Sequence, residues 1–157
     1  MEPLQGRRFD FALRCNDEAP ETAALIAAVD PELRGRLVQI LDEIEPGNAS
    51  AIAEIMYHDK VLSLVQVYFS GYTREVLTVL ARHASPAKPM NSISIATHLG
   101  MSAGGHKKIG STLARIDKNR GFRATGWRLC SRDIRPEDAV PIGLKSLYWF
   151  GFQAQEL

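Results

Sequence analysis

The sequence predicts an α+β fold that is mainly α, with several amphipathic helices ahead of a small β-hairpin. Three observations lead to this class. Apolar residues recur every three or four positions through most of residues 20–120, which is the spacing of one helix face. Prolines and glycines divide that region into segments of helical length. After Gly121 the pattern changes to two aromatic-rich stretches, FRATGWRLCSR and GLKSLYWFGF, as expected for two paired strands.

The chain of 157 residues has the length of one domain, or of a small domain with an extension. We expect a mainly helical N-terminal region over residues 1–70, used for dimerisation or partner contact, and a second domain over residues 71–157. No apolar run approaches the roughly 18 residues of a membrane span, and the first ten residues lack the features of a secretory signal. We therefore expect a cytoplasmic protein.

Start signals place the helices of the N-terminal region. Pro20 suits the first turn of a helix that runs to residue 29, and Asp30 and Pro31 suit the cap and first position of the next helix, which Pro46-Gly47 ends. Ahead of them, FDFALRC favours a short edge strand, with a disordered start left open. The alternating residues of that strand are Phe9, Phe11 and Leu13, and the apolar stripe of the helix after Pro31 is Leu33, Leu37, Ile40, Leu41 and Ile44.

The stretch from residue 51 to residue 69 is apolar on almost every side. Ile52, Ile55 and Met56 are the expected buried face of a helix over residues 51–59. Residues 61–69 favour a continuation of that helix, although their aromatic and β-branched content leaves a buried strand open.

The next two helices are separated by the proline-bearing loop ASPAKPMN. Thr73 is the expected cap of the first helix, and Asn91 or Ser92 begins the second, which Gly100 ends in a left-handed conformation. The inward residues are expected to be Val76, Leu77, Leu80 and Ala81 in the first helix and Ile93, Ala96 and Leu99 in the second.

The segment ATHLGMS resembles the second helix and turn of helix-turn-helix proteins. Ala96, Gly100 and Ser102 occupy the positions of the small residue, the turn glycine and the cap of the recognition helix, and Met101 that of the buried turn residue. The resemblance covers residues 72–132 and implies a winged helix-turn-helix that binds duplex DNA. Here the following apolar residues come about three positions later than usual, so either the turn is longer or the third helix begins loosely near His106.

The third helix, HKKIGSTLARIDKNR, is expected to bury Ile109, Leu113 and Ile116, and Gly121 is expected to end it. The resemblance implies that its exposed residues read bases and that basic residues of the helix and of the hairpin contact phosphates. The residues assigned to DNA binding are Ser102, His106, Lys107, Lys108, Ser111, Thr112, Arg115, Lys118, Arg123 and Arg128.

Charge is divided along the chain in a way that agrees with a phosphate-bearing partner. Residues 1–60 hold 6 Lys/Arg against 12 Asp/Glu, whereas residues 105–135 hold 9 Lys/Arg against 2 Asp. A locally basic face is what a nucleic acid backbone requires, with a merely solvated basic surface as the alternative interpretation.

Enzyme, metal and cofactor chemistry find little support in the sequence. None of the common phosphate-loop, dinucleotide, zinc-protease or serine-hydrolase motifs is present. Cys15 and Cys130 form no C-x-x-C pair, and the four histidines lack metal-ligand spacing. Trp127 and Trp149 are expected to be core residues, with stacking on single-stranded nucleic acid left open.

These observations predict a sequence-specific or general duplex-DNA-binding protein of bacterial or phage type, and we expect a transcriptional regulator that acts by occupying its site as a homodimer. That last step follows from fold analogy. Two alternatives stay open: a protein–protein adaptor whose winged helix does not bind DNA, and an accessory DNA-binding subunit of a DNA-processing system.

Overall fold

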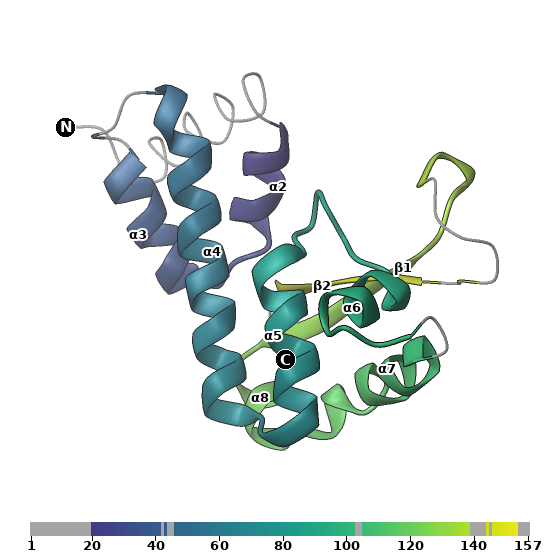
Figure 1. The fold of residues 1–157 in the computed structure, drawn as a ribbon. Helices are drawn as coiled ribbons and strands as arrows, with labels where there is room; N and C mark the ends of the chain where they lie inside the picture. Colours follow the sequence, from purple (N-terminus) through teal and green to yellow (C-terminus); the bar gives the residue numbers. More distant parts are fainter. Residues whose placement is uncertain are drawn as a thin grey trace. The chain divides into compact units, whose positions relative to one another are not determined.

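The structure is a computed structural model that describes residues 20–41, 43, 46–102, 105–138, 144 and 146–153. These residues form seven α-helices and one two-stranded antiparallel sheet near the C-terminus. The predicted class, α+β and mainly α, is therefore confirmed (Figure 1). None of the helices in the described ranges is long and apolar enough to cross a membrane.

The chain divides into two compact units, Met1–Lys60 and Val61–Leu157, and each is described by itself. The division falls inside a long helix, and the expectation of separate domains over residues 1–70 and 71–157 stays a prediction. The edge strand expected through Phe9, Phe11 and Leu13 lies outside the described residues, as do Cys15 and Ile44 and the side chain of Leu41.

In the first unit, α2 (Pro20–Ala27) and α3 (Pro31–Leu41) begin where the sequence signals placed them. The next helix, α4 (Pro46–Tyr68), has its first part in this unit and begins at Pro46, which was expected to end the preceding helix, so the expected start at residue 51 was wrong. The Asp30 carboxylate accepts a hydrogen bond from the backbone amide of Leu33 at 2.8 Å, which confirms the expected cap of α3. The other carboxylate oxygen of Asp30 lies 3.7 Å from the Lys60 ammonium on α4.

Helix α4 continues without a break through residues 61–68, so the helical interpretation of this stretch is confirmed and the strand alternative is wrong. Its buried residues are spaced by four: Ala53, Tyr57, Val61 and Val65. The expected face was wrong, since Ile55 is 60% exposed and Ile52 and Met56 are half-buried. Ile40 of α3, at 37% exposed, also lies outside the buried stripe. A helix that is apolar on nearly all sides has no periodicity that selects one face.

The second unit joins four helices to the hairpin (Figure 1). Helices α6 and α7 pack against each other and against α5, while β2 packs against α5 and α8 against β1. The elements are α5 (Gly71–His83), α6 (Ser92–His98), α7 (His106–Leu113), α8 (Arg120–Ala124), β1 (Trp127–Asp133) and β2 (Ser146–Phe152), with short 3-10 turns η2 (Ile116–Lys118) and η3 (Pro136–Asp138).

Helix α5 buries the predicted side chains but begins earlier than predicted. Val76, Leu77, Leu80 and Ala81 are all buried. Thr73 is not the cap, because the helix starts at Gly71 with Ser70 in the capping position. The tight turn from α4 explains the early start. Gly71 has a positive φ of 61°, and the Arg74 guanidinium donates to the Phe69 carbonyl at 2.7 Å.

Helix α6 begins and ends as predicted. The Asn91 side chain accepts from the Ser94 amide at 2.8 Å, and Gly100 has a φ of 72°. The inward face is shifted from the predicted one, since Ile95 and Ala96 are buried whereas Ile93 and Leu99 are only half-buried.

The helix expected over residues 106–120 is broken, and this prediction was wrong. Helix α7 ends at Leu113, and α8 begins again at Arg120. Asn119 starts the new helix: it caps α8 by accepting from the Phe122 amide at 3.0 Å and donates to the Tyr68 carbonyl at 2.7 Å. Gly121 therefore lies inside α8 and does not end a helix.

The hairpin begins five residues later than FRATGWRLCSR indicated. Phe122 is a buried helical residue in edge contact with Phe69 and Phe150, and the strand starts at Trp127 after Gly126, whose φ is 87°. The two strands pair from Trp127 opposite Phe152 to Asp133 opposite Ser146, so the predicted returning strand is confirmed.

Aromatic side chains of the hairpin complete the core of this unit. Trp127 and Phe150 are each 1% exposed, as expected of core residues, whereas Trp149 is half-buried. Met90, in the loop before α6, pairs with Tyr148 through two backbone hydrogen bonds of 3.0 and 2.8 Å. The hairpin is thereby tied to the loop that leads into α6.

Candidate nucleic-acid interface

Helix α7 has one buried apolar side and one exposed basic side. Ile109 and Leu113 are buried against the neighbouring helices, and Ile116 is buried just after the helix, as predicted. Lys107 and Lys108 are exposed at the beginning of the helix. The docked face fixes the helix and leaves both side chains accessible, although the Lys108 ammonium lies 4.2 Å from the centre of the Tyr72 ring.

The hydroxyl groups of α7 are bonded to its own backbone. Ser111 donates to the Lys107 carbonyl at 3.2 Å, and Thr112 donates to the Lys108 carbonyl at 3.0 Å. Because each hydroxyl proton is used within the helix, the oxygens remain as acceptors. A base edge that meets Ser111 or Thr112 would therefore offer a donor, such as an exocyclic amine.

The start of α7 differs from the predicted turn. Gly105 occupies the N-cap position and donates its backbone amide to the Ser102 carbonyl at 2.9 Å, so Ser102 is not the cap. Ser102 is exposed, His106 is half-buried as the first residue of the helix, and Met101 is half-buried and not fully enclosed. The helix begins at His106, where the expected segment HKKIGSTLARIDKNR also starts.

The remaining predicted cations follow α7 along the chain. Arg115 lies in the turn after α7, Lys118 in η2 and Arg123 in α8, and all three are exposed. Arg120, also exposed, belongs to the same group and was missed because the sequence placed it at the end of the recognition helix. None of these four side chains forms an ion pair with another residue of the described ranges.

The arginines of β1 are partly occupied by contacts within the protein. Arg128 is half-buried, and its guanidinium donates to the carbonyls of Arg123 and Trp127 at 2.6 and 2.9 Å. Arg132 makes a two-bond ion pair with Asp138 at 2.8 and 3.0 Å. This hydrogen-bonded pair raises the pKa of Arg132 and lowers the pKa of Asp138 to about 2. Arg128 still offers its charge to a partner, whereas the charge of Arg132 is neutralised.

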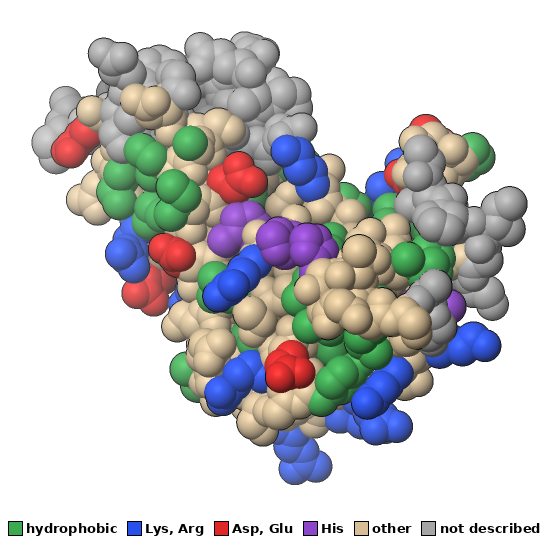
Figure 2. Space-filling model, viewed as in Figure 1, with side chains coloured by type: hydrophobic (Ala, Val, Ile, Leu, Met, Phe, Trp, Pro, Cys, Tyr) green, Lys and Arg blue, Asp and Glu red, His purple; other side chains and the backbone are tan. Residues whose placement is uncertain are grey.

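Lys and Arg side chains gather over α7 and along the edge of the molecule where α8 lies, with an acidic side chain also visible on this face (Figure 2). Contacts of α6 with α7, of η2 with α8 and of η2 with β1 hold these elements together. The break after Leu113 therefore keeps the basic residues of the second part near those of α7, although the chain changes direction between them.

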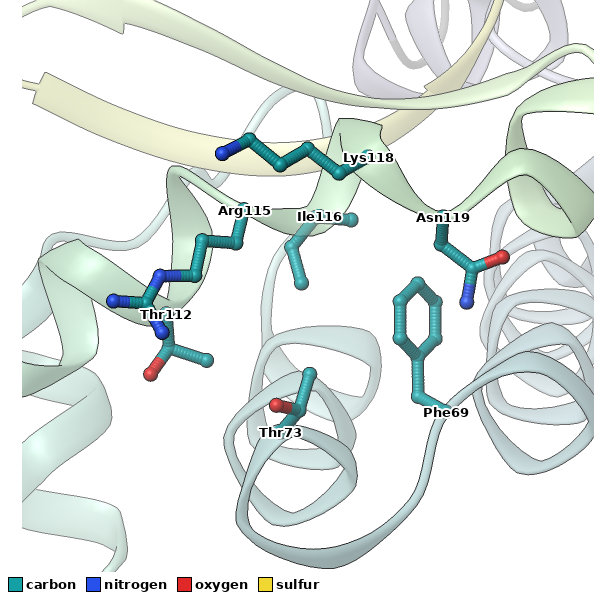
Figure 3. Close-up of a pocket in the computed structure, with 7 residues that line it drawn as sticks. All are labelled: Phe69, Thr73, Thr112, Arg115, Ile116, Lys118 and Asn119. Carbon is teal, nitrogen blue, oxygen red and sulfur yellow. The ribbon is translucent and has the colours of Figure 1, made fainter.

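A pocket opens beside this basic surface (Figure 3). It has a volume of about 340 Å³ and is lined from the end of α4, the first turn of α5 and the segment after α7. The lining residues are Phe69, Thr73, Thr112, Arg115, Ile116, Lys118 and Asn119. Thr73, Phe69 and Asn119 had no place in the sequence-based site, because only the tertiary fold brings them to residues 112–118.

Metal-ligating and nucleophilic groups are sparse in the described ranges. No group of three or more His, Cys, Asp or Glu side chains in these ranges is arranged to hold a metal ion. Cys130 is a free, half-buried thiol whose pKa is raised mainly by burial and further by the nearby charge of Asp117. At neutral pH this thiol is protonated and weakly nucleophilic.

Comparison with known proteins finds no family model, no curated protein and no solved structure that matches this chain.

Proposed function

We propose that the second unit is a winged helix-turn-helix that binds duplex DNA, with α7 as the recognition helix and the β1–β2 hairpin as the wing. One observation carries the proposal. Residues 107–123 hold six Lys/Arg and one Asp, and the six cations are exposed without an ion pair to any described residue. An unneutralised cationic surface of this kind fits the phosphate backbone.

The contacts divide into two classes by position. Ser111 lies on the exposed side of α7 and would meet a base edge if the helix enters the major groove, with the half-buried Thr112 beside it. Lys107 and Lys108, at the start of the helix, would contact phosphates. Arg115, Lys118 and the arginines of α8 lie beyond the helix and would contact phosphates. Most of the affinity would come from phosphates, and the few base contacts would supply specificity.

The biological role proposed from this activity is transcriptional regulation by occupancy, in the cytoplasm of a bacterium, without catalytic activity of its own. Homodimerisation through the helices of the first unit is part of the proposal.

The test is fluorescence anisotropy of a labelled random-sequence duplex titrated with the protein at several salt concentrations. Wild type should bind with an affinity that falls steeply with salt. The double variant K107A/K108A should bind more weakly to all sequences, with a salt slope reduced by about one to two contacts. The charge-matched control R82A/K88A removes two exposed cations outside α7 and should keep the wild-type slope.

Two results would contradict the proposal in different ways. Absence of binding by wild type at low salt would rule out the DNA-binding role. Equal affinity of K107A/K108A and wild type would remove α7 from the interface while leaving DNA binding to another surface.

A further inference from the structure

The pocket beside η2 combines a cationic rim with an apolar floor, and none of the described residues that line it is acidic. In Figure 3, the Arg115 guanidinium extends from the segment after α7 toward Thr112, and Thr73 lies on α5 below this segment. The Lys118 side chain runs along the opposite side of the backbone from Thr73, so it must change rotamer to reach a ligand in the pocket. The volume of about 340 Å³ is at the lower end of the range of small-molecule sites. The pocket is therefore large enough for a phosphorylated small molecule.

The polar groups of the rim are available to a ligand. The Arg115 guanidinium, the Lys118 ammonium and the Thr73 hydroxyl make no hydrogen bond or ion pair with any residue that the structure describes. Thr112 donates to the Lys108 carbonyl, which leaves its oxygen as an acceptor. Two cations and a free hydroxyl around one cavity favour an anion with several acceptor oxygens.

The rest of the pocket is held in place by the core. Asn119 uses both ends of its amide, which bond to the Tyr68 carbonyl at 2.7 Å and to the Phe122 amide at 3.0 Å. Phe69 is 8% exposed and packs edge-on against Phe122 at 5.2 Å, and Ile116 is 2% exposed. The floor is thus formed before any ligand binds, and only the two cationic side chains need to be ordered on binding.

We propose that this pocket binds a phosphoryl group. Arg115 and Lys118 bind its oxygens from the rim and the Thr73 hydroxyl donates a hydrogen bond from α5. Two sources share this chemistry: a free phosphate monoester of nucleotide size, whose organic part contacts Phe69 and Ile116, or a phosphate of the DNA backbone. The second source rests on the proposed function, whereas the first does not.

The test is a titration of the isotope-labelled full chain with inorganic phosphate and, separately, with adenosine monophosphate at constant ionic strength. Binding is monitored by the chemical shifts of the backbone amides in NMR spectra. Saturable shifts centred on Thr73, Thr112 and Asn119 are expected. The variants T73V and R115Q should weaken binding about tenfold, because each loses a hydrogen bond to a charged group. R82A, which removes an exposed cation of α5 outside both the pocket and the proposed DNA surface, should bind phosphate as wild type does.

Competition with duplex DNA distinguishes the two sources. Displacement of phosphate by the duplex, together with weaker duplex binding by T73V, assigns the pocket to the DNA backbone. Wild-type duplex affinity in T73V, with adenosine monophosphate bound at the same time as the duplex, assigns it to a free phosphate monoester. T73V preserves the shape of the side chain, and its amide spectrum checks that the variant is folded.

The proposal is overturned if neither phosphate compound produces saturable shifts at these residues and T73V binds duplex as tightly as wild type does. Failure of DNA binding would be seen separately in wild type and K107A/K108A, and it would leave the titrations with free phosphate compounds unaffected.

Discussion

The Lys108 ammonium lies 4.2 Å from the centre of the Tyr72 ring, and the hydroxyl of that ring donates to the Met101 sulfur at 3.7 Å. Tyr72 belongs to the first turn of α5, Lys108 to α7 and Met101 to the turn between α6 and α7. One side chain therefore connects the recognition helix of our proposal to two other parts of the helical unit. It also restrains a cation that we assign to DNA binding.

Replacement of Tyr72 should separate the role of the ring from that of the hydroxyl. Tyr72→Leu removes the cation–π contact and should lower the free energy of unfolding by about 0.5–1 kcal/mol. Tyr72→Phe keeps the ring and loses only a weak contact to sulfur, so it should unfold close to wild type in urea. Equal losses of unfolding free energy in the two variants would show that the Tyr72 hydroxyl, and not its ring, provides the stabilising contact.

Asn119 should be a stronger point of stability than an ordinary helix cap. Asn119→Ala removes the cap of α8 and the bond to the Tyr68 carbonyl, and we expect a loss of about 1.5–3 kcal/mol in urea unfolding. Asn119→Asp keeps the capping oxygen but cannot donate to the Tyr68 carbonyl. Its stability in urea should therefore lie between those of wild type and Asn119→Ala. Wild-type stability in the Asp variant would mean that the Tyr68 bond contributes nothing.

Two glycines with positive φ should respond differently to alanine. Gly100 has open space where a Cβ would be placed, so Gly100→Ala bears only the backbone cost of about 1–2 kcal/mol. At Gly126 a Cβ would collide with the Phe152 ring, so Gly126→Ala should lose clearly more, and the hairpin should shift. Thermal unfolding of the two variants provides the comparison, and a loss in Gly126→Ala no greater than that in Gly100→Ala would contradict it.

The parts of the fold that the sequence predicted depend on local signals. The buried stripe of α5, the Asn91 cap and the Gly100 exit each need only residues within one or two helical turns. The two strands were recognised for the same reason, since their aromatic pattern is also local.

The break in the helix expected over residues 106–120 was missed because the contacts there are distant in sequence. Ile109, Leu113 and Ile116 keep helical spacing, so the pattern alone continues one helix beyond Leu113. Asn119, which caps the new helix α8, also bonds to Tyr68, 51 residues away. The phosphoryl pocket could not be predicted for the same reason: Thr73 and Arg115 meet only after α5 and the segment after α7 have packed.

The cationic residues show a different limit of the sequence. The pattern identified most of the exposed cations, because charge composition is visible without a structure. It did not show that Arg132 is paired within the chain, since the charged partner Asp138 lies in a separate 3-10 turn. The positions of basic residues can therefore be predicted from sequence more reliably than whether an ion pair neutralises their charge.

The Arg132–Asp138 pair gives the hairpin a dependence on pH that can be measured directly. The Arg132 hydrogen bonds are the main cause that lowers the pKa of Asp138 to about 2, and the Arg135 backbone amide, which donates at 2.6 Å, is the next. A carboxyl with a lowered pKa in the folded state stabilises the fold above its ordinary pKa, and this contribution is lost as the pH falls through about 2.

NMR titration of the Asp138 carboxyl carbon should find this midpoint in wild type. In Arg132→Gln the midpoint should rise part of the way to the ordinary range, because the backbone donor remains. Arg135→Gln keeps that backbone amide and should leave the midpoint nearly unchanged, and a rise as large as that in Arg132→Gln would show that general charge, and not the hydrogen-bonded pair, sets the pKa of Asp138.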